Sequence, residues 1–124
     1  MTFTYNSSNG VLSRNGEQIG VGYAGHGAGL NNPAMESVHS VGPLPRGRYT
    51  IGEFVDRPHV GKFAAPLTPD PANVMYGRDG FFMHGMNEQD AMTGSHTSSD
   101  GCPIFIIPIR KQVAASGDTD LLVV

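Results

Sequence analysis

Glycine and proline interrupt this chain so often that long helices are disfavoured in most of it. The 124 residues include 17 glycines and 9 prolines, and both residue types end regular structure or mark turns. The segments between them are short, and several alternate apolar and polar residues as half-buried strands do. These features predict a mostly β fold with one or two short helices. The chain has the length of one domain, so we expect residues 1–124 to form a single unit.

The amino-terminal segment has the pattern of a three-stranded meander. The strand-like runs are "FTY", "VLSR" and "EQIGVGY". They are separated by "NSSNG" and by Asn15-Gly16, the dipeptide that best supplies two residues of positive φ to a type I′ hairpin. Residues 24–36 contain too much glycine and asparagine for regular structure. They predict a loop that borders a cleft.

The remaining segments predict further strands and two helical stretches. A strand is expected in "RYTIGEFV", and a hairpin is expected in "VMYGRDGFFMHG" with Asp79-Gly80 at its turn. "IFII" has the composition of a buried strand, "NEQDAM" is expected to form one helical turn, and "DLLVV" is expected to close the chain as a strand. "PIRKQVAAS" has proline at a helix N1 position and Gly117 at its end, which predicts a helix.

Charge and hydropathy exclude several classes of partner. Eight basic and eleven acidic residues give a net charge of −3, and the basic residues are scattered, which argues against nucleic acid. No run of 18 apolar residues occurs, and "MTFTYNSSNG" has neither a basic n-region nor an apolar h-region. We therefore expect no membrane span and no Sec signal, and hence a protein that is made in the cytoplasm and exported by another route.

The only cysteine, Cys102, follows Ser-Asp-Gly and has histidines upstream of it. A thiol is nucleophilic as the thiolate, so it needs a histidine base or positive surroundings. His84 ends a predicted strand 18 positions earlier, where rigid backbone aims its ring, whereas His96 lies in a Ser/Thr-rich loop. We therefore predict His84 as the base, with a backbone carbonyl holding its second ring nitrogen. The amides of Asp100, Gly101 and Cys102 fit an oxyanion hole for acyl transfer.

Two other interpretations of these residues remain open. A single cysteine ahead of "IFII" is more often a small buried apolar residue than a nucleophile. His84, His96, Cys102 and Asp100 are also residue types that bind zinc, although the close ligand pairs typical of zinc sites on one hairpin are missing. Thiol reactivity separates enzyme from inert domain, because a thiol paired with a base reacts well below its usual pKa of about 8.5. We expect no metal and no other cofactor.

The histidine and cysteine segments together resemble a known signature. His84-Gly85, thirteen intervening residues and then "SDGC" at 99–102 are similar to the L,D-transpeptidase signature, in which His-Gly or His-Ser is followed by Ser/Thr-His-Gly-Cys at this spacing. The segments "GVGYAGHGAGLNNPAMESVHSVGPLPRGRYTI", "GRDGFFMHG" and "IRKQV…LLVV" resemble one branch, the small type VI secretion effectors with an L,D-transpeptidase-like domain. The resemblance covers nearly all of the chain.

This resemblance implies an L,D-transpeptidase-type β-sandwich that acts on peptidoglycan stem tetrapeptides. Such enzymes cleave between the L-centre of diaminopimelate and the following D-residue, release D-alanine, and pass the acyl group to water (L,D-carboxypeptidase) or to an amine (transpeptidase or D-amino-acid exchange). The resemblance places the nucleophile at Cys102, the base at His84 and supporting residues of the motif at Gly85, Ser99 and Gly101.

The resemblance also implies a biological role. It indicates an antibacterial effector that is delivered to the periplasm of a target bacterium, with a cognate immunity protein as a candidate partner. The alternatives are a phage lysin or wall-remodelling enzyme of the same fold, and a non-catalytic β domain that binds the cell wall.

Two positions depart from the signature. Asp100 replaces the histidine beside the glycine, which removes a donor from the pocket and adds a carboxylate. Ile104 replaces the arginine commonly found two residues after the cysteine, so a substrate carboxylate needs another partner. Arg78, close ahead of His84, is the best candidate for that role, and an exposed turn arginine is the alternative interpretation. Tyr23 and His96 are further candidates for contacts with the substrate.

Overall fold

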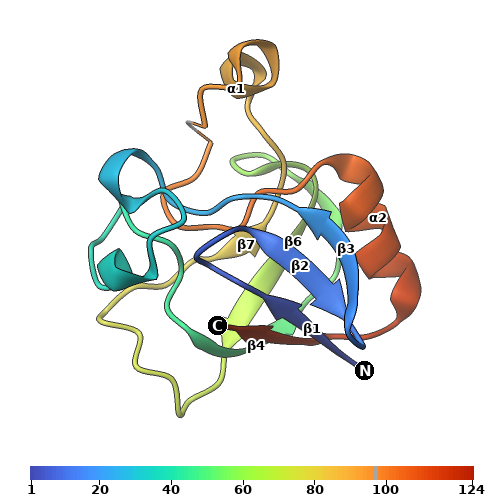
Figure 1. The fold of residues 1–124 in the computed structure, drawn as a ribbon. Coiled ribbons are helices and arrows are strands. Elements are labelled where there is room, and N and C mark those ends of the chain that lie inside the picture. Colours follow the sequence, from blue (N-terminus) through green and yellow to red (C-terminus); the bar gives the residue numbers. More distant parts are fainter. Residues whose placement is uncertain (97) are drawn as a thin grey trace.

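The computed structural model describes residues 1–96 and 98–124, which fold mainly into β-strands (Figure 1). The strands are β1 (Thr2–Tyr5), β2 (Val11–Arg14), β3 (Glu17–Val21), β4 (Gly47–Ile51), β5 (Val55–Arg57), β6 (Gly61–Pro69), β7 (Phe82–Met83) and β8 (Asp120–Val123). The helices are α1 (Glu88–Thr93) and α2 (Ile107–Ser116), with short 3₁₀ turns at Gly27–Gly29 and Pro33–Met35. The mostly β fold with short helices is confirmed.

The predicted amino-terminal meander is confirmed. β1 pairs antiparallel with β2, and β2 pairs antiparallel with β3. At the turn between β2 and β3, Asn15 has φ of 54° and Gly16 has φ of 79°, which is the pair of positive values that a type I′ hairpin requires.

The carboxy-terminal strand β8 occupies the middle of the sheet. The strand order is β3-β2-β1-β8-β4-β6-β5, and β7 pairs with β6 outside this path. β8 runs parallel to β1, with Thr2 opposite Asp120, and antiparallel to β4. The first and last strands of the chain therefore lie side by side (Figure 1). The sheet is therefore complete only when residues from both ends of the sequence have paired.

Single bridges at Ile104 link the two ends of the curled sheet. Ile104 forms an antiparallel bridge to Tyr23, just beyond β3, and a parallel bridge to His84, just beyond β7. The His84 N–H donates to the Pro103 carbonyl at 3.3 Å, and the Phe105 N–H donates to the His84 carbonyl at 3.0 Å. These bonds hold the segment after Cys102 beside the end of β7, and so fix the distance between the predicted base and the predicted nucleophile.

Two predicted elements differ from the structure. The hairpin centred on Asp79-Gly80 is wrong: its first half forms no strand, and β7 pairs with β6 instead. Arg78 explains this difference, because its side chain turns into the protein, where it is 6 % exposed. The "IFII" strand is also wrong beyond Ile104, since Ile106 and Ile107 are exposed and α2 starts at Ile107. The predicted helix ahead of Gly117 is confirmed.

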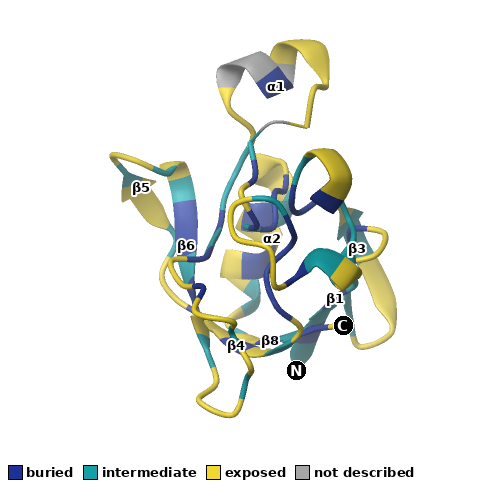
Figure 2. Ribbon diagram, turned by 90° about the vertical axis from the view of Figure 1, so that its left-hand side faces the viewer, coloured by how far each residue is buried: buried dark blue, intermediate teal, exposed yellow. Residues whose placement is uncertain are grey.

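Inward-facing residues of the central strands fill the core. They alternate along each strand, as the period of two requires. These residues are Phe3 and Tyr5 of β1, Tyr49 and Ile51 of β4, and Leu121 and Val123 of β8. Exposed residues concentrate at loops and hairpin tips (Figure 2), and α1 stands away from the rest of the molecule (Figure 1). None of the helices in the described part of the chain has the length and apolar character of a membrane span.

Candidate active site

His84 has one ring nitrogen held by the backbone. Its Nδ1 lies 2.9 Å from the Gly85 carbonyl. Because a carbonyl can only accept, Nδ1 carries the proton, which leaves the lone pair of the neutral ring on Nε2. This is the backbone acceptor that the sequence predicted. The ring is half-buried, and burial, together with the Arg110 charge, lowers the pKa of His84 below 6.5, against the opposing effect of the Gly85 bond.

The Cys102 thiol is held neutral by its surroundings. It packs against the core, and the Phe82 N–H donates to its Sγ at 3.3 Å. Burial raises the pKa of Cys102 to about 11, aided by the Asp100 charge and opposed by the Phe82 N–H and the Arg78 charge. The expected low thiol pKa is therefore not what the isolated protein has. Desolvation outweighs the groups that favour the thiolate.

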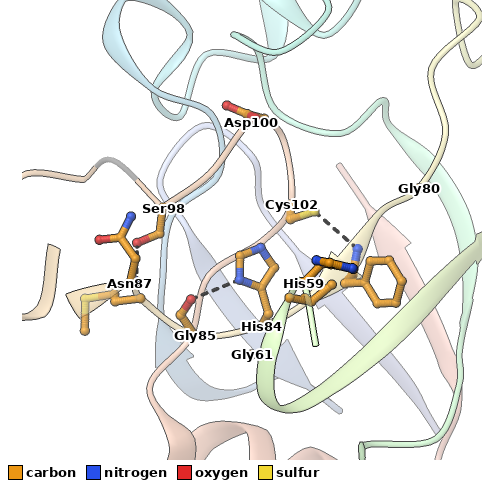
Figure 3. Close-up of a pocket in the computed structure, with 12 residues that line it drawn as sticks. His59, Gly61, Gly80, His84, Gly85, Asn87, Ser98, Asp100 and Cys102 are labelled. Atoms are coloured by element: carbon orange, nitrogen blue, oxygen red, sulfur yellow. Dashed lines mark hydrogen bonds between the residues drawn. The ribbon is translucent and has the colours of Figure 1, made fainter. Parts of the chain in front are cut away.

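His84 and Cys102 open onto one pocket of about 560 Å³ (Figure 3). The close-up shows the Nδ1 edge of the His84 ring at the Gly85 carbonyl and the opposite ring edge turned toward Cys102. Loops on both sides supply the remaining walls. The lining residues include His59, Gly61, Phe82, Asn87, Ser98 and Asp100. The structure therefore brings together the predicted base and nucleophile from elements that are 18 positions apart.

Ser99 fixes the turn that carries Cys102. Its side chain is 1 % exposed. Its Oγ donates to the Cys102 carbonyl at 2.6 Å and accepts from the N–H groups of Gly101 at 3.0 Å and Gly25 at 2.9 Å. The Gly101 N–H is thus already used, so it is removed from the predicted oxyanion hole. The amides of Asp100 and Cys102 remain in that prediction.

Arg78 is placed differently from the expected substrate contact. Its Nη1 donates to the carbonyls of Glu36 and Pro43, and its Nη2 donates to those of Gly42 and Asp100, at 2.6 to 3.0 Å. Four of its five N–H groups are thereby committed to backbone. The prediction that Arg78 binds a substrate carboxylate is corrected, because only Nε–H is left for a ligand.

Tyr23 and His96 do not line the Cys102 pocket. They lie against a separate hollow of about 260 Å³, where their rings meet edge to face at 4.8 Å. The Tyr23 hydroxyl donates to Asp90, whose buried carboxylate also accepts from Ser98 Oγ and the His96 N–H. Both residues therefore shape the segment around α1 rather than a surface beside the thiol.

The structure adds residues that the sequence analysis missed. His26 donates from Nδ1 to the Ser99 carbonyl at 2.9 Å, and that nitrogen lies 3.6 Å from Asp100 Oδ1. His59, in the turn between β5 and β6, lines the pocket. His26 lies in the glycine-rich loop that was predicted to border a cleft, and that prediction could have pointed to His26 as a residue near the site. The segment "RPHVGK" around His59 indicates only a turn and gives no sign of a site.

The zinc ligands considered from the sequence do not gather. His96 lies at the separate hollow, and Asp100 and Cys102 lie at the pocket with His84. Among the residues that the structure describes, no group of three or more histidine, cysteine, aspartate or glutamate residues is placed to hold a metal ion.

A family model named the Tlde1 domain matches residues 19–119. The chain belongs to the Tlde1 domain family. This family comprises type VI secretion L,D-transpeptidase effectors, so the resemblance found in the sequence is confirmed. The Tlde1 match includes both His84 and Cys102, and membership implies delivery into target cells. No curated protein and no solved structure gives a significant match to this chain.

Proposed function

We propose that this Tlde1 domain is a cysteine-dependent acyl-transfer enzyme, formed by residues 1–124, that acts on peptidoglycan stem tetrapeptides. The observation that carries the proposal is the pairing of His84 and Cys102 in one pocket, with Nδ1 of the ring held by the Gly85 carbonyl. That bond orients Nε2 as the acceptor for a proton. An orienting group behind a base beside a nucleophile is the arrangement that covalent catalysis needs.

The free enzyme holds both groups neutral, so proton transfer must accompany attack. The thiol has a pKa of about 11, while the pKa of the imidazole lies below 6.5. Moving the proton from sulfur to nitrogen before substrate binds is therefore unfavourable. In the proposed reaction His84 Nε2 takes the thiol proton while Sγ attacks the carbonyl carbon of the L-centre of diaminopimelate.

In the remaining steps, His84 carries each proton between the thiol, the leaving amine and the acceptor. The carbonyl oxygen becomes an oxyanion, which the amides of Cys102 and Asp100 stabilise. The C–N bond to the D-residue then breaks, and the His84 imidazolium gives its proton to the leaving amine. Water or the amine of a D-amino acid next attacks the thioester, losing a proton to His84, and the thiolate leaves and recovers that proton. Water yields the shortened stem, and an amine yields an exchanged or cross-linked stem.

A second candidate function is a non-catalytic domain that binds the cell wall. The raised thiol pKa and the packing of Cys102 against the core favour it. The Tlde1 match and the orientation of His84 favour the enzyme. A phage lysin or wall-remodelling enzyme would share the chemistry, and membership of an effector family favours the antibacterial role. We propose that the enzyme acts in the periplasm of the target cell and that its producer carries an immunity protein against it.

Mass spectrometry of purified muropeptides incubated with the protein tests this proposal. We expect loss of D-alanine from tetrapeptide stems, and D-amino-acid exchange when a D-amino acid is added. Cys102→Ala should fold normally and release nothing, because it removes the nucleophile and only a small side chain. Turnover by Cys102→Ala would exclude the covalent mechanism. Binding of muropeptides without any turnover by the intact protein would favour the non-catalytic domain.

A further inference from the structure

Two buried arginine side chains lie against residues that line the pocket, Arg78 against Asp100 and Arg110 against Gly85. Arg78 is 6 % exposed and Arg110 is 7 % exposed. Within residues 1–96 and 98–124, neither guanidinium forms a salt bridge with a carboxylate. Their donors go to backbone carbonyls instead, so each keeps its full positive charge inside the protein. A buried charge without a counter-ion is costly, which makes an ordinary packing role a poor explanation for two of them.

Arg78 connects the turn that carries the thiol to a loop far away in sequence. Its guanidinium donates to the carbonyls of Glu36, Gly42 and Pro43 on one side and to that of Asp100 on the other. Asp100 lies two residues before Cys102. A planar fork with four bonds permits little movement of any group that it joins, so Arg78 restrains the backbone from which the thiol projects.

Arg110 plays the corresponding part on the other side of the pocket. Its Nε donates to the Phe105 carbonyl at 2.9 Å, and its Nη1 donates to the carbonyls of Lys62 at 2.7 Å and Phe63 at 2.9 Å. The Phe105 N–H in turn donates to the His84 carbonyl at 3.0 Å. Arg110 therefore ties the backbone beside the imidazole to the start of β6.

Each guanidinium lies against a glycine of the histidine or cysteine motif. A Cβ at Gly101 would overlap Arg78 Nη2, and a Cβ at Gly85 would overlap Arg110 Nη2 and come within 3.0 Å of Cζ. Gly85 follows His84 directly, and Gly101 precedes Cys102 directly. The absence of a side chain at these two motif glycines therefore leaves the space that each guanidinium occupies beside the segment of a reacting residue.

We propose that Arg78 and Arg110 are paired positioning residues: Arg78 sets the Cys102 thiol and Arg110 sets the His84 imidazole. This proposal deepens the proposed function and rests on it for its catalytic meaning. The electrostatics agree with it. The Arg78 charge lowers the pKa of Cys102, and the Arg110 charge lowers the pKa of His84. The Arg78 charge thus favours the thiolate that forms during attack, and the Arg110 charge favours the neutral imidazole that is needed before attack.

Arg78→Met and Arg110→Met test the pair, and each is the matched control for the other. Arg78→Met should lower the rate of Cys102 alkylation by iodoacetamide at pH 8 by roughly tenfold, which corresponds to one unit of thiol pKa. Arg110→Met should leave that rate within about twofold, and should move the acidic limb of kcat/KM toward higher pH, because His84 loses a neighbouring cation. On muropeptides, both variants should lower kcat by about 10²-fold, with KM within about threefold.

Lysine variants separate charge from geometry. Arg78→Lys keeps the charge but loses the fork, so it should recover most of the alkylation rate and little of kcat. A purely structural role predicts lower melting temperatures with unchanged alkylation and kcat for the folded protein, and that result would overturn the proposal. So would identical pH profiles for the two methionine variants. Alkylation uses no cell-wall substrate, so the Arg78 assignment can succeed or fail independently of the proposed function.

If the methionine variants do not fold, side-chain NMR of the intact protein provides the test. The Nη protons of Arg78 and Arg110 should be resolved and slow to exchange, because carbonyls hold them. A Cys102→Ser variant should show the same Nη proton signals, because both arginines donate to backbone carbonyls and not to the thiol. Rapidly exchanging, freely rotating guanidinium groups would refute the proposal.

Discussion

Replacing Gly101 with alanine should destabilise the protein more than an equivalent change at a glycine with open space. Gly101 has φ of +139°, and an added Cβ would overlap Arg78 Nη2 and lie 2.9 Å from Phe81 Cε1. Backbone strain at such a φ costs about 1–3 kcal/mol, and overpacking costs about 1–3 kcal/mol more. The sum, about 2–6 kcal/mol, corresponds to a loss of roughly 15 °C in melting temperature at its centre.

Gly61→Ala is the matched control. Gly61 has φ of +114°, and an added Cβ would meet nothing within 4 Å, so this variant has the strain without the overlap. Urea and thermal unfolding of both variants measure the difference, which we expect to be about 1–3 kcal/mol. If Gly101→Ala is no less stable than Gly61→Ala, Arg78 does not approach the turn before Cys102 closely enough to position the thiol.

Four further results are expected. His84→Ala should reduce D-alanine release by about 10²–10⁴-fold, while His96→Ala, whose ring packs on Tyr23, should stay within about threefold; the reverse ranking would move the base to the loop. In the intact enzyme the acidic limb of kcat/KM should fall below pH 6.5, since burial lowers the pKa of His84, and a limb above pH 6.5 would contradict that assignment. The folded-state pKa of Asp90 is lowered, so its carboxylate contributes stability that is complete above the unfolded value of about 3.9 and is lost as pH falls through the folded value. The difference in free energy of unfolding between the unchanged protein and Asp90→Asn should therefore decrease below pH 4 in urea titrations. A difference that increases there would exclude this role. Incubation with EDTA should leave muropeptide turnover unchanged, and a loss of activity that zinc restores would bring back the metal interpretation.

Local patterns were sufficient for much of the fold. Asn15-Gly16 predicted its hairpin because two adjacent residues alone supply the positive φ values of that turn. The helix ahead of Gly117 was predicted by its own proline and glycine. The hairpin at Asp79-Gly80 failed because burial of the Arg78 side chain, a tertiary effect, overrides the turn preference of the dipeptide. The "IFII" run failed because an apolar stretch does not by itself distinguish a strand from the start of a helix.

The sequence by itself determined the chemistry that we propose for this protein. One thiol, a histidine at a strand end and a glycine beside each are enough to predict a small set of reactions, because residue type and spacing indicate a candidate nucleophile and a candidate base. The acceptor behind His84 was also predictable, since Gly85 is its neighbour in the chain.

Only the tertiary structure decided how the two reacting groups are held. Arg78 and Arg110 look like solvated residues in the sequence, because nothing local shows that carbonyls up to 48 residues away will surround them. The pKa of the thiol likewise depends on how much water the fold removes from Cys102, and that desolvation exceeds the effect of the neighbouring donor and cation. Burial and long-range hydrogen bonds are properties of the assembled chain, so no pattern along the sequence contains them.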